Sequence, residues 1–312
     1  TNYEFNQSAD TTVYAFFTKK TYTITYKQGA NGSGSIDAGT KEHGVNYTLS
    51  SNKFTRTGYT QTGWSTSDGG AKVYDLGGTY TANTNVTLYP FWTPNQYTIT
   101  LAPNGGSGNN QYVTATYNSN VLIGTITKPT RTGYDFIGWG MQKENKDRIV
   151  IDIEGYLQAN KSDATLGEYT GEGGIWKRAE ATTLYANWLA KQQTITLDKQ
   201  GGEGGTNSID VTYNEAMPNI EIPRRNGYEF AGWYKEPECT NNVTTLGATD
   251  YTSDITLYAK WTPNTYTVQF DANGGTGTMD SQSFTYDVEQ ALTANSFSRA
   301  GYRFTGWGIN SA

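Results

Sequence analysis

Histidine and cysteine, two side chains that often carry acid–base and nucleophilic chemistry, are scarce in this sequence. His43 is the only histidine and Cys239 the only cysteine among 312 residues. One histidine cannot supply a repeated Ser–His–Asp arrangement, and one cysteine cannot form an internal disulfide or a thiolate metal cluster. Cys239 also follows two nearby glutamates, which disfavour its thiolate form. Because no pair of carboxylates recurs at a spacing that would face a cleft, the sequence predicts a protein without catalytic residues.

Glycine pairs and short acidic stretches are the segments that most resemble phosphate or metal loops. The glycine pairs are Gly105-Gly106, Gly201-Gly202 and Gly274-Gly275. No Lys-Ser/Thr dipeptide or predicted helix follows them, so they indicate hairpin turns rather than phosphate loops. Residues 271–274 begin like a calcium loop but lack the later acidic ligands, and we interpret the glutamates between 154 and 180 as a solvated surface. We therefore expect no metal site and no cofactor.

Charge and hydropathy exclude two classes of partner. The net charge is −6, and the 23 basic residues are dispersed along the chain rather than clustered. We therefore expect that the chain binds no nucleic acid, because a phosphate-tracking surface needs a basic cluster. No apolar run reaches the roughly 18–20 residues that a membrane-spanning helix needs. The sequence thus predicts no membrane span within these residues.

Tryptophan shows the clearest pattern, and an indole ring can either stack on a sugar or fill a core. Seven of the eight tryptophans recur in two motifs, as Trp64, Trp92, Trp139, Trp188, Trp233, Trp261 and Trp307. They recur at predicted strand positions in units poor in aliphatic residues, so we predict that they form the structural core. Trp176 lies outside both motifs, and for it we keep open a contact with a ligand.

The two motifs repeat with a period of about 75 residues. The first reads Gly-Tyr-x-Phe-x-Gly-Trp or a close variant and begins at Gly58, Gly133, Gly227 and Gly301. The second reads Leu-Tyr-x-x-Trp and begins at Leu88, Leu184 and Leu257. Self-similarity at a fixed period predicts a tandem array of small domains.

Domain boundaries follow from this period. We predict the closing strand of a preceding repeat in residues 1–20, repeat 1 in 21–94, repeat 2 in 95–190 with an insertion at about 141–178, repeat 3 in 191–263, and repeat 4 in 264–312, truncated before its closing strand. The links between repeats are short and two contain proline, which favours an extended, stiff connection.

Within each repeat the apolar residues alternate with a period of two, which predicts strands. The first two runs, such as 97–101 and 113–117, surround a Gly/Asn-rich turn and predict a β-hairpin. The next stretch, such as 214–223 or 287–297, could hold one or two helical turns. The two aromatic motifs form the last two strands, and residues 149–153 predict an extra strand within the insertion.

On these two motifs and their period, the chain resembles the Listeria–Bacteroides repeat, also called the internalin B B-repeat, over about 290 of its residues. Three positions depart from the pattern: Phe17, Gln61 and Pro90. The resemblance implies an α+β, mostly β fold of tandem small β-grasp-like (ubiquitin-like) repeats in an elongated array. It also implies placement in bacterial cell-surface proteins, between a ligand-binding region and an anchor, and no enzymatic activity.

Two functions are therefore weighed. The first is an extracellular stalk or spacer that projects an adhesive domain and contributes weak adhesion. The second is a module that binds a host surface protein or glycan through the repeat 2 insertion. The ends suggest a further partner: residues 11–17 look like a closing strand without a repeat, and repeat 4 lacks one. This predicts either head-to-tail strand exchange between copies or partial remodelling of repeat 4.

Overall fold

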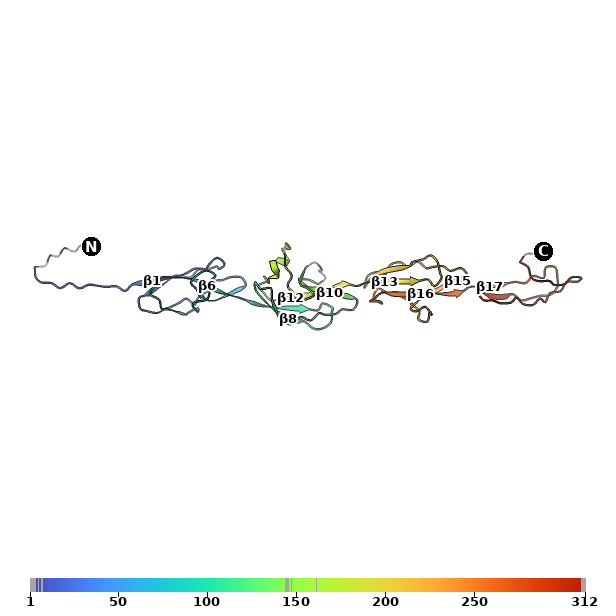
Figure 1. The fold of residues 1–312 in the computed structure, drawn as a ribbon, viewed down its shortest axis with the longest axis horizontal. Coiled ribbons are helices and arrows are strands. Elements are labelled where there is room, and N and C mark those ends of the chain that lie inside the picture. Colours follow the sequence, from blue (N-terminus) through green and yellow to red (C-terminus); the bar gives the residue numbers. More distant parts are fainter. Residues whose placement is uncertain are drawn as a thin grey trace. The chain divides into compact units, whose positions relative to one another are not determined.

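The computed structural model describes residues 4, 6, 8–143, 146, 148–160 and 162–309. These residues are nearly all β-structure, with almost no helix. Their contacts divide the chain into two units: Thr1–Pro129 with Phe136–Asn187, and Thr130–Asp135 with Trp188–Ala312. Figure 1 shows successive groups of strands along the chain, from β1 in blue to β17 in red.

Repeat 1 contains a four-stranded sheet in the order β2-β1-β6-β4. Its strands are β1 (Thr21–Tyr26), β2 (Gly39–Glu42), β4 (Tyr59–Ser65) and β6 (Val86–Pro94). The first and last strands lie side by side and parallel at its centre, and the other neighbours are antiparallel. A separate pair, β3 (Tyr47–Thr48) and β5 (Thr79–Tyr80), completes this repeat.

Repeats 2 and 3 have the same central arrangement. The six-stranded sheet of repeat 2 has the order β11-β10-β12-β7-β8-β9, and the sheet of repeat 3 has the order β14-β13-β16-β15. Repeat 2 consists of β7 (Gln96–Ala102), β8 (Gln111–Thr116), β9 (Leu122–Ile123), β10 (Tyr134–Gly140), β11 (Ile149–Ile151) and β12 (Thr182–Ala190). Repeat 3 consists of β13 (Gln192–Asp198), β14 (Ser208–Thr212), β15 (Tyr228–Tyr234) and β16 (Ile255–Pro263). The predicted hairpins and the extra strand at 149–151 are confirmed.

Apolar and polar residues alternate along the two central strands of each sheet in repeats 1 to 3. Because successive side chains point to opposite faces of a sheet, this alternation places the apolar residues on one face. In β16, Leu257 and Ala259 are buried while Thr256 and Tyr258 are only partly covered. The parallel neighbour β13 buries Ile195 and Leu197 in the same way. The two strands thus present one apolar face to the core of repeat 3.

The second glycine of the first motif forms a β-bulge. In β15 the register with β16 shifts between Phe230 and Gly232, so that one extra residue stands on the motif strand. Gly232 has φ +115°, a backbone conformation that side-chain-bearing residues rarely adopt. The same shift occurs before Gly63 in β4. At Gly232 the backbone conformation of the bulge favours glycine, whereas at Gly63 φ is ordinary and a Cβ would lie 2.6 Å from the Tyr74 carbonyl oxygen.

The expectation of helical turns between the second and third strands is wrong. Neither 214–223 nor 287–297 contains a helix in the structure. In the first segment Pro218 and Pro223 remove backbone donors and disfavour helical dihedrals in the residue before each proline. The helical turns among the described residues are two 3₁₀ turns in the insertion, η1 (Leu166–Glu168) and η2 (Glu172–Gly174).

Repeat 4 retains the hairpin of β17 (Thr265–Val268) and β18 (Gln282–Thr285). Residues 302–308 carry the first motif but form no strand. In repeats 1 and 3 this motif strand pairs along its length with the closing strand, and no copy of the closing motif follows Trp307 in this sequence. Residues 11–20 likewise form no strand, and Phe16 and Phe17 are exposed.

Candidate functional site

The seven recurrent tryptophans lie in or against the cores of their repeats. Four are buried, namely Trp64, Trp139, Trp188 and Trp233. Three are half-buried, namely Trp92, Trp261 and Trp307. Trp64 illustrates the packing: its ring centroid lies 4.7 Å from that of Tyr26 and 6.1 Å from that of Phe54, and its Nε1 donates to the Ser50 carbonyl at 3.1 Å. In a unit poor in aliphatic side chains, such ring contacts supply much of the buried apolar area.

Trp176, for which a contact with a ligand was left open, is fully buried, with 0 % of its surface exposed. Its backbone N–H donates to the Ser119 carbonyl at 2.8 Å, and its carbonyl accepts from Asn118 at 2.8 Å. The Tyr169 ring meets it edge-on at 6.3 Å. Trp176 therefore fastens the insertion to the turn after β8. The period could not reveal this role, because it identifies only the core positions that all repeats share.

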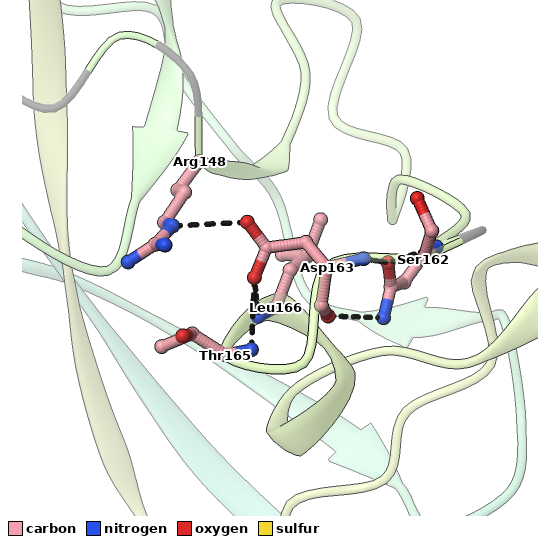
Figure 2. A network of polar contacts seen from close by, with 6 residues as sticks. Arg148, Ser162, Asp163, Thr165 and Leu166 are labelled. Atoms are coloured by element: carbon pink, nitrogen blue, oxygen red, sulfur yellow. Dashed lines mark hydrogen bonds and ion pairs between the residues drawn. The ribbon is translucent and has the colours of Figure 1, made fainter.

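Asp163 organises the centre of the insertion (Figure 2). Its Oδ2 accepts from Arg148 Nε at 3.0 Å, and its Oδ1 accepts from the backbone N–H groups of Thr165 and Leu166 at 2.8 and 3.0 Å. Those backbone bonds, that of Leu166 first, together with the Arg148 guanidinium, hold the pKa of Asp163 below its ordinary value of 3.8. Both carboxylate oxygens are occupied, so this network caps the turn at η1 rather than offering a free ligand.

We expect this network to make the insertion sensitive to acid. A carboxylate whose pKa is lowered on folding stabilises the fold at any pH above its unfolded pKa, and that stabilisation is lost as pH falls through the folded value. The wild-type chain should therefore have a higher thermal midpoint than Asp163→Asn above pH 3.8, and the difference should disappear in stronger acid. Thermal unfolding of both proteins across this pH range measures it. A difference that persists unchanged in strong acid would contradict the assignment.

The other chemically suggestive residues have local partners. In the insertion, Glu154 pairs with Lys128 at 3.0 Å, and Arg178 pairs with Glu168 and Glu180. Half-buried Cys239 accepts a hydrogen bond from Gln200 Nε2 at 3.3 Å. Among the residues that the structure describes, no three His, Cys, Asp or Glu side chains come together as a metal site would require. No helix among them has the length and hydrophobicity needed to cross a bilayer.

Two features of repeat 1 were missed from the sequence. Lys41 is buried at the inward-facing position that Val211 occupies in repeat 3, and its Nζ donates to Asn83 Oδ1 at 2.8 Å. An open cleft of about 510 Å³ lies beside Gly29, lined on one side by Tyr89. Gln200 stands at the position of Gly29 in repeat 3, where its amide donates to the Pro237 carbonyl. Gly29 has no side chain to fill this space, and that difference between the two repeats is the sequence feature that could have indicated the cleft.

Successive repeats are joined by a single residue between strands. Asn95 separates β6 from β7, Lys191 separates β12 from β13, and Asn264 separates β16 from β17. The N–H of each linking residue donates at 2.9 Å to the carbonyl of the first glycine of the preceding motif. The carbonyl of each linking residue accepts at 2.9 Å from the residue that follows the next hairpin. The linking residue is thus held by a backbone bond on each side.

One family of known proteins matches four separate segments of this chain. The model of the Listeria-Bacteroides repeat domain matches residues 22–90, 97–167, 194–260 and 266–312. A Gly-rich membrane protein of Evansella cellulosilytica is 28 % identical over 80 % of this chain, and a second membrane protein of that organism is 27 % identical over 73 %. Internalin H of Listeria monocytogenes is 36 % identical over 38 % of this chain.

These relatives are much longer than the matched region. The aligned parts span 26 %, 31 % and 20 % of the lengths of the three relatives, respectively. What is shared with them is therefore a repeat region within larger membrane or surface proteins. The family match covers most of the sequence in four copies, and it confirms the resemblance drawn from the two aromatic motifs. The chain belongs to the Listeria-Bacteroides repeat family.

Proposed function

We propose that this chain is a non-enzymatic repeat region of a bacterial cell-surface protein, acting outside the cell as a stalk or spacer that projects an adhesive domain. The observation that carries the proposal is the junction between repeats, where one residue, bonded on both sides, separates the closing strand of one repeat from the first strand of the next. A spacer needs such links, because a long flexible linker would let neighbouring domains reorient freely.

The proposal includes a β-grasp-like fold for each repeat. In its support, the first and closing strands are parallel neighbours at the centre of the sheets of repeats 1 to 3, with a hairpin strand on one side and the motif strand on the other. The segment between hairpin and motif strand, which would hold the helix of a β-grasp domain, contains no helix here and holds the short strands β3 and β9 in repeats 1 and 2. The proposed domains are those of the sequence period, with strands β1, β7, β13 and β17 opening repeats 1 to 4.

A length series tests the stalk function. Variants with one and two added copies of residues 191–263, placed after residue 263, should increase the maximum dimension measured by small-angle X-ray scattering by a constant increment per copy. A flexible Gly-Ser insertion after Asn95 should broaden the distance distribution in the original chain. Added repeats that leave the maximum dimension unchanged would refute a spacer role.

The alternative function, binding of a glycan or host protein, is examined in the same samples on glycan and matrix-protein arrays. The stalk function predicts no saturable binding. Saturable binding lost on deletion of residues 141–178 would favour the insertion as the binding element. Loss on Tyr89→Ala, with the insertion intact, would instead place the site in the repeat 1 cleft, since this half-buried ring lines it.

A further inference from the structure

An aromatic ring covers the first glycine of the first motif at every junction between repeats. The ring belongs to the residue after the next hairpin: Tyr117 over Gly58 in one unit, and Tyr213 over Gly133 and Tyr286 over Gly227 in the other. A Cβ atom on these glycines would lie 2.3, 2.3 and 2.4 Å from ring atoms, far inside van der Waals contact. The rings thus approach the backbone as closely as only glycine allows.

Two more residues of the motif region frame each ring. At the first junction, the Tyr59 ring meets Tyr117 edge-on with centroids 5.5 Å apart, and the Arg56 guanidinium lies 3.8 Å from the Tyr59 centroid. The other two junctions repeat these contacts at 5.4 and 5.5 Å for the ring pair, and at 4.0 and 4.1 Å for the arginine. Edge-to-face rings and a guanidinium over a tyrosine are both attractive arrangements.

We infer that the Arg-x-Gly-Tyr segment of each repeat is a docking surface for an aromatic side chain of another repeat of the same type. The segment receives the residue that follows the β-hairpin of the incoming repeat, while its arginine also contacts its own repeat, as Arg56 does at 5.9 Å from the Trp92 ring. Its first glycine meets two requirements, a left-handed φ and a ring that lies against the backbone. This inference concerns how repeats recognise one another, and it does not depend on a stalk role.

Repeat 4 shows the surface without a ring. Arg299 lies 4.2 Å from the Tyr302 ring centroid, as its counterparts do in repeats 1 to 3, and Gly301 has no neighbouring atom within 4 Å where a Cβ would stand. Gly301 has φ +82°, close to the +77° of Gly58. Tyr302 is 70 % exposed. The turn therefore adopts its conformation without an incoming ring, and the surface fits the hairpin end of a further repeat of this type.

The incoming position is aromatic in all four repeats. His43 occupies it in repeat 1: its N–H donates at 2.9 Å to the Lys20 carbonyl, as that of Tyr117 donates to Asn95. The His43 ring lies 6.1 Å from that of Tyr22, and Nδ1 is 2.9 Å from the Tyr22 hydroxyl. The residue after each hairpin is thus built to present a ring, whatever repeat it belongs to.

Hydrogen exchange of the full chain tests the inference with a matched pair of glycine variants. Gly58→Ala and Gly301→Ala impose similar dihedral strain, but only Gly58→Ala collides with a ring. We expect Gly58→Ala to speed amide exchange of Asn95 and Tyr117 at its own junction, while Asn264 and Tyr286 keep their protection. Gly301→Ala should leave all three junctions protected. Equal effects of the two variants on the Asn95 amide would overturn the inference.

A double variant removes the ambiguity that strain alone could create. Tyr117→Ala should itself speed Asn95 exchange, because the ring contact is lost. Adding Gly58→Ala to Tyr117→Ala should then speed exchange by a much smaller factor than Gly58→Ala does in the wild-type chain, since no ring remains to collide. If the factor is the same with and without the ring, the glycine serves only the dihedral angle and the docking role is wrong.

Discussion

Replacing Trp176 with alanine is expected to destabilise repeat 2 by about 3–5 kcal/mol, the usual cost of truncating a buried tryptophan. The ring has no exposed surface, and its backbone bonds to Asn118 and Ser119 tie the insertion to the turn after β8. Its loss would leave a large cavity between insertion and repeat, because packed surroundings relax only partly. Urea unfolding with amide-resolved hydrogen exchange measures the effect within repeat 2.

Tyr156→Ala is the matched control, since it removes a large ring from the same insertion at a position that is 69 % exposed. We expect its effect on unfolding to be within about 0.5 kcal/mol, as for ordinary surface substitutions. The comparison also separates packing from ligand binding. If Trp176→Ala left stability unchanged and abolished binding on the arrays, the assignment of this side chain to the interior of the insertion would be wrong.

The repeated parts of the fold were predictable because strands have a strict period of two and the motifs recur in register. The hairpins, the motif strands and the closing strands of repeats 1 to 3 all follow from alternation in the sequence. Paired strands need only local patterning and a turn. The same logic fails for residues 302–308, which carry the motif but form no strand in the structure.

The unrepeated parts were not predictable, for two physical reasons. Whether Trp176 is buried depends on where a loop folds back, and loop length and composition do not determine that path. Lys41 shows the second reason: it is a charged residue at an inward position of β2, and its burial depends on the distant partner Asn83 together with the Glu42 carbonyl. The contact between the first glycine of each motif and a ring of the next repeat was not predicted either. Such a contact joins residues far apart in the sequence and produces no local sequence pattern.

Proline at Thr256 is expected to destabilise repeat 3 by about 1–3 kcal/mol, since proline cannot donate to a ladder and is confined to edge strands, strand starts and bulges. Thr256 lies in β16 opposite Thr196 of the parallel strand β13, two residues before Tyr258, where β16 begins to pair with β15 as well. Breaking this strand separates the first strand from the motif strand and exposes the core around Leu257.

Thr256→Val is the matched control, because it keeps the N–H and the β-branched shape, and it should leave the unfolding midpoint within about 0.5 kcal/mol of wild type. Amide exchange resolved along the chain should show loss of protection in β13 to β16 for the proline variant and unchanged protection in β1, whose core cluster is separate. Repeats that each contribute their own core unfold locally, so the loss should fade with distance from β16. If Thr256→Pro behaved like Thr256→Val, the parallel pairing of the closing strand with the first strand at Thr196 and Thr256 would be wrong.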